Sequence, residues 1–252
     1  ALLFLGAGAV IHALGGEQDL ERMGGLRRAL PLTYWTFLAG ALALAGVPLL
    51  AGFFSKDEIL FRVFAAGHPV LWTLGVATTL LTAIYAFRLV FLAFHGESRA
   101  PAGAHPHDPP PSMAVPLVAL AAGAVAAGYV GVPAALGGSN WIGRVLEPVF
   151  AGAHAPEAAH EVSHATELLL TVVSAAAALA GIALAHRLVL ARPDRAAALA
   201  ARVPRLAALL SRKYYVDEAY DAVVVRPLVR ASERVLWRGI DARVIDGAVH
   251  GL

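Results

Sequence analysis

The 252-residue sequence contains no cysteine at all. That absence excludes a disulfide framework, thiolate metal sites, iron–sulfur clusters and a cysteine nucleophile. The sequence therefore offers no cysteine-bound metal or cluster, and we assign the chain no cofactor and no metal.

Charged residues are also scarce. They make up 15% of the chain, against 58% for hydrophobic residues, whereas soluble domains have about 25% charged and about 45–50% apolar residues. A core of ordinary size cannot hide that much apolar surface, so lipid is the expected solvent. The net charge of +2 is nearly balanced, and we expect no nucleic-acid partner.

The first residues lack the marks of a signal peptide. No basic segment precedes the apolar stretch 1–14, and no small-residue cleavage site follows it. Fourteen residues are too few to cross a bilayer, which takes roughly 20. We interpret residues 1–14 as the last part of a helix that begins before Ala1, and the chain as the C-terminal part of a longer protein.

Four longer apolar runs follow this first stretch. They cover residues 33–64, 69–94, 113–132 and 166–191. Each is long enough to cross a hydrocarbon core about 30 Å thick as a helix, and isolated strands could not satisfy their backbone in lipid. The sequence predicts an all-α, polytopic membrane bundle over residues 1–191, made of a partial helix and four spanning segments.

Basic residues predict the orientation of this bundle. The connections 15–32 and 95–112 and the tail fall on one side, because an even number of crossings separates them, and this side carries most of the arginines near the membrane. The side that holds loop 133–165 has only Arg62 and Arg144. By the positive-inside rule the first side is cytoplasmic. We expect residues 141–150 to form an amphipathic patch on the opposite side.

The tail, residues 192–252, has a different composition. It holds 11 of the 20 lysines and arginines and 7 of the 18 acidic residues. From Tyr214 apolar residues recur every three or four positions, which is typical of an amphipathic helix that lies along a surface. Pro227 is expected to kink this helix. We treat the tail as a separate region on the cytoplasmic face.

A break is predicted in the run 33–64. Thr33 follows Pro31 and is expected to cap the start of the helix, but Gly46 and Pro48 stand in the middle of the run. Proline lacks an N–H group and clashes with the carbonyl four residues earlier, here that of Leu44. Membrane transporters use broken helices at their ion sites. The sequence therefore predicts two half-helices that meet at Gly46–Pro48.

Lys56 and Asp57 follow this break and are the leading site candidates. Desolvation and a nearby carboxylate shift a lysine in opposite directions, so a buried lysine can load and release a proton, as proton relays require. Arg88, alone in its apolar run, and His12, in an apolar context near a helix end, are further relay candidates. The alternative for Lys56 and Arg88 is that each side chain extends to the membrane–water interface and has no role in transport. The alternative for His12 is that it is a structural histidine.

A zinc motif is a competing interpretation of one loop. Residues His160–His164 fit the H-E-x-x-H pattern of zinc proteases. No third ligand follows at a recognised spacing, although His154, Glu157 and Glu167 are available, and the motif lies in a region rich in Ala, His and Glu. We do not expect zinc chemistry here.

Three stretches resemble one known family. These are VIHALGGEQDLERMGGLRRALPLTYWTFLAGALALAGVPLLAGFFSKDEIL (10–60), TAIYAFRLVFLAFHGE (82–97) and SRKYYVDEAYDAVVVRPL (211–228), with DARVIDG (241–247) after the last. Together they resemble the antiporter-like, proton-translocating subunits of NADH–quinone oxidoreductase (respiratory complex I), in particular the subunit L family. The related subunit M family is expected to carry Glu at the position of Lys56 and to lack the tail.

The resemblance implies a role for each candidate. It places Lys56 in a broken channel helix near the proton exit, with Asp57 beside it, and His12 in a polar axis that links the channel halves. It makes Tyr214–Leu252 the beginning of a long lateral helix, with other membrane subunits of the complex and the lipid bilayer as partners. It also implies that electrons pass from NADH to quinone in other subunits, in a bacterial inner membrane.

Two other functions remain open at this point. The chain could belong to a cation/proton antiporter or to a membrane-bound hydrogenase, which contain related subunits. It could also be a membrane scaffold without a transport role, in which case replacement of Lys56 would leave pumping unchanged.

Overall fold

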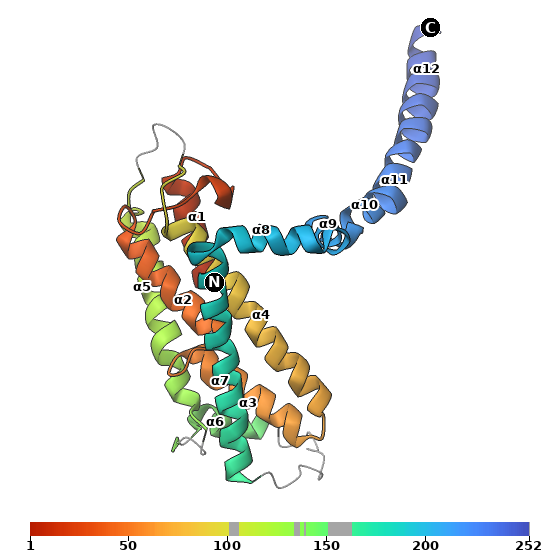
Figure 1. The fold of residues 1–252 in the computed structure, drawn as a ribbon. Coiled ribbons are helices and arrows are strands. Elements are labelled where there is room, and N and C mark those ends of the chain that lie inside the picture. The colour runs from red at the N-terminus through yellow and green to blue at the C-terminus, as the bar shows by residue number, and fades with distance from the viewer. Residues whose placement is uncertain (101–105, 134–136, 139, 151–162, 252) are drawn as a thin grey trace. The chain divides into compact units, whose positions relative to one another are not determined.

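The computed structural model describes residues 1–100, 106–133, 137–138, 140–150 and 163–251. Within these ranges every regular element is a helix and no strand occurs. Contacts divide the chain into two units, Ala1–Pro193 and Asp194–Leu252. Each unit is described by itself below, and the helices are labelled in Figure 1.

The first unit is a bundle of apolar helices. Its members are α1 (Leu2–Ala13), α2 (Pro31–Ala45), α3 (Ala51–Ala65), α4 (Pro69–Phe94), α5 (Pro111–Ala126), α6 (Trp141–Phe150) and α7 (His164–His186). A 3₁₀ segment, Ala127–Gly131, extends α5, and a π-helical segment, Arg187–Ala191, extends α7. Helix α2 packs against α1, α4 and α5, and α4 packs along α7.

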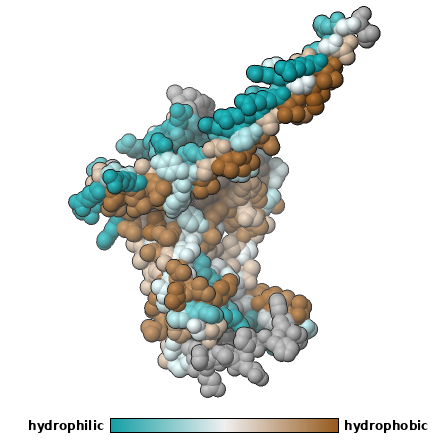
Figure 2. All heavy atoms as spheres, turned by 90° about the vertical axis from the view of Figure 1, so that its right-hand side faces the viewer, coloured by the Kyte–Doolittle hydropathy of each residue, from teal (hydrophilic) through white to brown (hydrophobic). Residues whose placement is uncertain are grey.

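Three of these helices are long and apolar enough to cross a membrane. They are Pro69–Phe94, Pro111–Gly131 and His164–Ala191, and α1 and α2 are shorter apolar helices. They match three of the four runs predicted from the sequence, and the remaining run, 33–64, forms the two shorter helices α2 and α3. The all-helical membrane fold is therefore confirmed. Figure 2 shows hydrophobic residues over much of the side of the bundle, as expected of a surface in contact with lipid.

The predicted break in the second apolar run is confirmed. Helix α2 ends at Gly46, whose φ of +81° is left-handed, and α3 begins at Ala51. The Gly46 N–H donates to the Ala43 carbonyl and the Val47 N–H to the Leu42 carbonyl, which is the Schellman arrangement that closes many helices. Because glycine adopts positive φ without a Cβ clash, Gly46 allows the turn that separates the half-helices.

The start of α2 differs from the prediction. The helix begins at Pro31, and Thr33 is not its cap. Instead the carboxylate of Asp108, from the distant 106–110 segment, accepts hydrogen bonds of 3.1 Å from the Leu32 and Thr33 N–H groups and from the Thr33 hydroxyl. An anion at a helix N-terminus satisfies free N–H groups and is favoured by the helix dipole. Sequence pattern missed this cap because its donors and acceptor lie 75 and 76 residues apart.

The connection between α1 and α2 closes the end of α4. The N–H groups of Gly25, Leu26 and Arg27 donate to the carbonyls of His95, Ala93 and Phe94. The Arg99 side chain bonds both the Glu21 carbonyl, at 2.8 Å, and the Leu92 carbonyl, at 3.1 Å. The carbonyls that α4 leaves free at its C-terminus therefore have partners.

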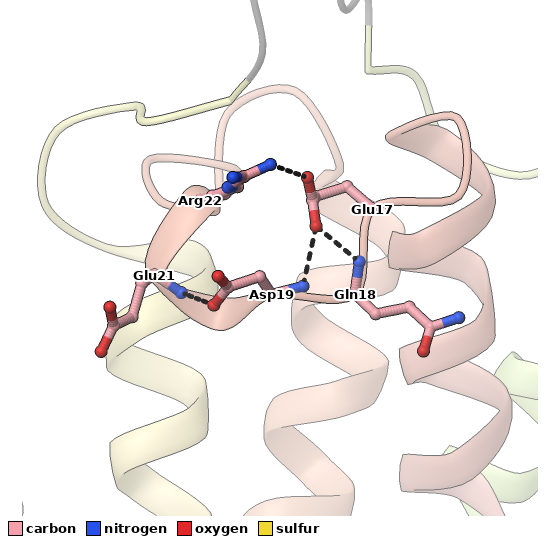
Figure 3. Close-up of polar contacts among 5 residues, drawn as sticks. All are labelled: Glu17, Gln18, Asp19, Glu21 and Arg22. Atoms are coloured by element: carbon pink, nitrogen blue, oxygen red, sulfur yellow. Dashed lines mark hydrogen bonds and ion pairs between the residues drawn. The ribbon is translucent and has the colours of Figure 1, made fainter.

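Earlier in the same connection, polar side chains fix a tight local structure. Figure 3 shows Glu17 accepting hydrogen bonds from the N–H groups of Gln18 and Asp19 and pairing with Arg22, while Asp19 accepts from the Glu21 N–H. These bonds hold the water-facing turn predicted for this segment. With the bonds to α4, they place connections 15–30 and 95–99 at the same end of the bundle.

The core of the bundle lies near this end. Aromatic residues of α2 and α4 pack together there: Tyr34 lies edge to face against Phe94 at a centroid distance of 5.4 Å, and Phe37 lies tilted against Phe94 at 5.5 Å. Arg27 lies over the Tyr34 ring at 5.0 Å. Such contacts add to the burial of apolar surface and hold the helices in one arrangement.

The second unit is a series of helical segments. It contains α8 (Pro193–Arg202), α9 (Pro204–Ser211), α10 (Val216–Tyr220), α11 (Arg226–Ala231) and α12 (Asp246–His250), with π-helical segments at Asp221–Val225 and Ser232–Ile245. Lys213, Tyr214 and Tyr215 have positive φ and separate α9 from α10. The helical pattern predicted from Tyr214 therefore starts two residues later, at Val216.

Pro227 is accommodated by a wider turn in the tail. Backbone dihedrals stay helical on both sides of it, at Arg226 and Ser232, and the π-helical turn Asp221–Val225 ends two residues before it. A π turn changes the hydrogen-bond register, which removes the demand for the N–H that proline lacks. Figure 2 shows hydrophobic residues along one edge of this tail and hydrophilic residues along the other, in line with an amphipathic helix.

Candidate functional site

The Lys56 side chain lies at the break between α2 and α3. Its Nζ donates a hydrogen bond of 3.0 Å to the carbonyl oxygen of Leu44. In an uninterrupted helix that carbonyl would accept from the N–H of residue 48, which is proline. The lysine ammonium therefore takes the place of the missing backbone donor.

Two glycines make room for this arrangement. A Cβ on Gly46 would lie 3.5 Å from Lys56 Cδ and 3.7 Å from its Nζ, so the lysine passes directly over the glycine. A Cβ on Gly52 would overlap the carbonyl oxygen of Ala43. The first turn of α3 can thus approach the end of α2 only because residue 52 has no side chain.

Lys56 also lines a cavity between α2, α3 and α4. The cavity has a volume of about 520 Å³. Four polar side chains of α4 line it together with the lysine: Thr78, Thr79, Thr82 and Tyr85. Hydroxyl groups can take part in hydrogen bonds with water, so this wall can hold water next to the ammonium.

Asp57 points toward a different helix. Its side chain is buried, with 7% of the residue exposed, and its Oδ2 accepts a hydrogen bond of 2.6 Å from the Thr171 hydroxyl of α7. That hydroxyl also lies 3.1 Å from the carbonyl oxygen of Glu167, one turn earlier in α7. A buried carboxylate without such a donor would be strongly destabilising.

Lys56 and Asp57 do not form an ion pair with each other in the described part of the chain. Consecutive residues of a helix face directions about 100° apart. One group therefore faces the cavity beside α4, and the other faces α7. Sequence reasoning placed the two charges side by side, whereas the structure gives each its own partner on a different face of α3.

His12 and Arg88 lie outside this site. His12 is exposed in the last turn of α1 despite its apolar sequence context, because α1 buries the face formed by Leu2, Gly6, Ala9 and Val10. Arg88 is exposed on α4, one turn beyond the cavity residue Tyr85. The structure brings neither of them to Lys56.

The zinc motif is only partly within the described residues. His160 and Glu161 lie outside them, as do His154 and Glu157. His164 stands at the start of α7, where its Nδ1 lies 3.5 Å from a Glu167 carboxylate oxygen. This histidine therefore has a partner within its own helix.

Two hydrogen-bond partners in the site were not predicted from the sequence: the Leu44 carbonyl and the Thr171 hydroxyl. The Leu44 carbonyl could have been found, because proline at position 48 identifies it as the acceptor that loses its donor. Thr171 carries no comparable signal, because it is 114 residues away from Asp57 in sequence. Only the packing of α3 on α7 brings the two together.

The fold and site define a class of protein: a membrane helix bundle with a broken helix, whose second half carries a lysine bonded across the break and a buried carboxylate. Comparison with known sequences gives the family. Residues 1–82 match the family described as NADH:quinone oxidoreductase/Mrp antiporter, transmembrane.

Several curated relatives align with nearly the whole chain. NAD(P)H-quinone oxidoreductase chain 5 of Picosynechococcus is 40% identical over 99% of this chain and 40% of its own length. NADH-quinone oxidoreductase subunit L of Mycobacterium tuberculosis is 41% identical over 99% of this chain and 38% of its own. NADH-ubiquinone oxidoreductase chain 5 of Phytophthora infestans is 50% identical over 52% of this chain and 20% of its own.

The chain belongs to the family of NADH–quinone oxidoreductase subunit L and chain 5. It spans about 40% of the length of the curated relatives that it matches. The resemblance noted in the sequence therefore holds over the tail as well as over the bundle.

Proposed function

We propose that this chain is part of the membrane subunit that moves protons in an NADH–quinone oxidoreductase, and that Lys56 is a proton relay within it. Electron transfer from NADH to quinone then takes place in other subunits, and this subunit answers with proton translocation. The hydrogen bond of 3.0 Å between Lys56 Nζ and the Leu44 carbonyl carries the proposal.

The position of Lys56 suits a relay for two reasons. In its charged form the ammonium is stabilised by a carbonyl that has lost its backbone donor, so the charge has a fixed resting place inside an apolar bundle. In its neutral form the amine can leave that carbonyl, because hydroxyl-bearing side chains of α4 and the cavity beside them offer other partners. A group that is stable in both forms can load and release protons.

The surrounding parts of the molecule fit the same role. The end of the bundle formed by connections 15–30 and 95–99 carries Arg22, Arg27, Arg28 and Arg99, and the positive-inside rule makes it the cytoplasmic end. Lys56 then lies in the half of the broken helix that leads to the outer side, where a proton would leave. We place the protein in a bacterial cytoplasmic membrane.

The tail is proposed to bind neighbouring membrane subunits. None of the described residues of α9 to α12 is buried, and apolar side chains such as Val216, Tyr220 and Leu228 are exposed along it. An amphipathic helix with an uncovered apolar face needs a partner or a membrane interface. His12 and Arg88, which are exposed on this chain, are proposed to face polar groups of the same translocation path.

Replacement of Lys56 tests the proposal. In the full-length protein within its complex, Lys56→Ala should lower proton pumping in membrane vesicles while the complex still assembles. Arg62→Ala is the matched control, because Arg62 is an exposed cation of the same helix that pairs with Glu58. Pumping that is normal in the Lys56 variant would remove the relay assignment.

An antiporter subunit is the second candidate function. The family matched by residues 1–82 includes Mrp antiporters in its description. The relatives that align over 99% of the chain, including the tail, are named as quinone oxidoreductase subunits. Sodium-dependent proton exchange by the full-length protein without its quinone-reducing partners would favour the antiporter.

A further inference from the structure

Thr171 of α7 has two hydrogen-bond partners within reach. Its Oγ1 lies 2.6 Å from Asp57 Oδ2 and 3.1 Å from the Glu167 carbonyl oxygen. A hydroxyl has one proton to donate and two lone pairs with which to accept. It can therefore donate to only one of these oxygens at a time.

The two partners correspond to two protonation states of Asp57. When Asp57 is a carboxylate, Thr171 donates its proton to Oδ2. When Asp57 is protonated, its own O–H donates to Thr171 Oγ1, and Thr171 turns its proton to the Glu167 carbonyl. In both states Asp57 Oδ2 and the Thr171 hydroxyl are hydrogen-bonded to each other, and Thr171 neither gains nor loses a proton.

This property matters because Asp57 is buried. A buried polar group that loses its partner is destabilised by about 1–3 kcal/mol, and more if it is charged. A fixed donor, such as a backbone N–H, would satisfy only the carboxylate. The rotatable hydroxyl lets Asp57 take up one proton and release it again while Oδ2 keeps its hydrogen bond to Thr171 in either state.

We infer that Thr171 is a positioning residue that allows Asp57 to cycle between its charged and neutral forms, so that α7 supplies the second step of the relay after Lys56. The inference rests on the proposed function, since it concerns the same proton path. It goes beyond that function by giving α7 a part in translocation. Glu167 lies one turn from Thr171 toward the start of α7, and its side chain is 19% exposed, so the path continues toward the outer end of this helix.

Conservative substitutions at position 171 separate this role from a purely structural one. Valine has the shape of threonine but no hydroxyl, whereas serine keeps the hydroxyl. In the full-length protein within its complex, Thr171→Val should lower the number of protons pumped per NADH oxidised at least twofold and change the pH profile of pumping. Thr171→Ser should restore both. Thr73→Val is the control, because the Thr73 hydroxyl bonds the Pro69 carbonyl of its own helix, at 2.9 Å, in an exposed turn of α4.

Infrared difference spectroscopy supplies a readout that does not depend on pumping. The carboxyl band of Asp57, identified as the one lost in Asp57→Asn, should move in Thr171→Val and return in Thr171→Ser. A Thr171→Val protein with unchanged pumping stoichiometry, pH profile and carboxyl band would overturn the inference. If Lys56→Ala lowers pumping but Thr171→Val does not, only the role of α7 fails; if Lys56→Ala pumps normally, the proposed function fails first.

Discussion

Lys56 Nζ donates a hydrogen bond to the carbonyl oxygen of Leu44, at 3.0 Å, the acceptor that Pro48 leaves without a backbone donor. A break in a membrane helix exposes backbone groups that lipid cannot satisfy. Here the side chain that satisfies one of them belongs to the second half-helix and carries an ionisable group. The break and the proposed relay are therefore parts of the same structure.

The close contact between the half-helices predicts the effect of a methyl group at position 52. In Gly52→Ala the new Cβ would overlap the Ala43 carbonyl, and overpacking of this kind destabilises by about 1–3 kcal/mol. Gly123→Ala is the matched control, since a Cβ there meets nothing within 4 Å. Thermal unfolding of the detergent-solubilised full-length protein should show a lower midpoint for Gly52→Ala only. Equal midpoints would mean that the half-helices are not in contact at this residue.

The cap of α2 by Asp108 predicts that replacing this residue, which lies before α5, lowers the stability of the protein. Asp108→Ala removes the acceptor for the Leu32 and Thr33 N–H groups, and loss of such a cap destabilises by about 0.5–2 kcal/mol. Asp108→Asn keeps one acceptor oxygen and should have a smaller effect. Denaturant unfolding measures both. An alanine variant as stable as the parent would contradict the cap.

His95 predicts how stability changes with pH at the end of the bundle where connections 15–30 and 95–99 meet. Burial, the positive charge of Arg27 and the neighbouring His186 lower the pKa of His95 below its ordinary value. The unfolded chain therefore takes up a proton at higher pH than the folded one, so the folded state is destabilised as pH falls through about 6.5. Above that pH both states are neutral and no effect remains.

The corresponding variant is His95→Gln, which cannot take up a proton. Between about pH 7 and pH 5 it should lose less stability than the parent. His68→Gln serves as the comparison, because His68 is exposed before the start of α4. The measurement is the melting midpoint of each protein at several pH values in this range. If the midpoints of His95→Gln and the parent fall equally with pH, His95 is not the cause of the pH dependence.

The sequence predicted those parts of the fold that follow from local rules. The break at Gly46–Pro48 follows from the missing N–H of proline, and the spanning helices follow from their apolar length. The cap of α2 by Asp108 and the bond between Asp57 and Thr171 could not be predicted, because each depends on how distant segments pack. The exposure of His12 could not be predicted for the same reason, because it depends on which face of α1 packs against neighbouring helices.

The most direct test of the relay compares two replacements of Lys56. Arginine keeps a positive charge and a donor for the Leu44 carbonyl but cannot release its proton. Alanine has no charge, no donor and no proton to release. We predict that in the full-length protein within its complex both Lys56→Arg and Lys56→Ala lower the number of protons pumped per NADH oxidised. If Lys56→Arg pumps like the parent and only Lys56→Ala is impaired, Lys56 is a structural cation that fills the break in the helix, and the relay account is wrong.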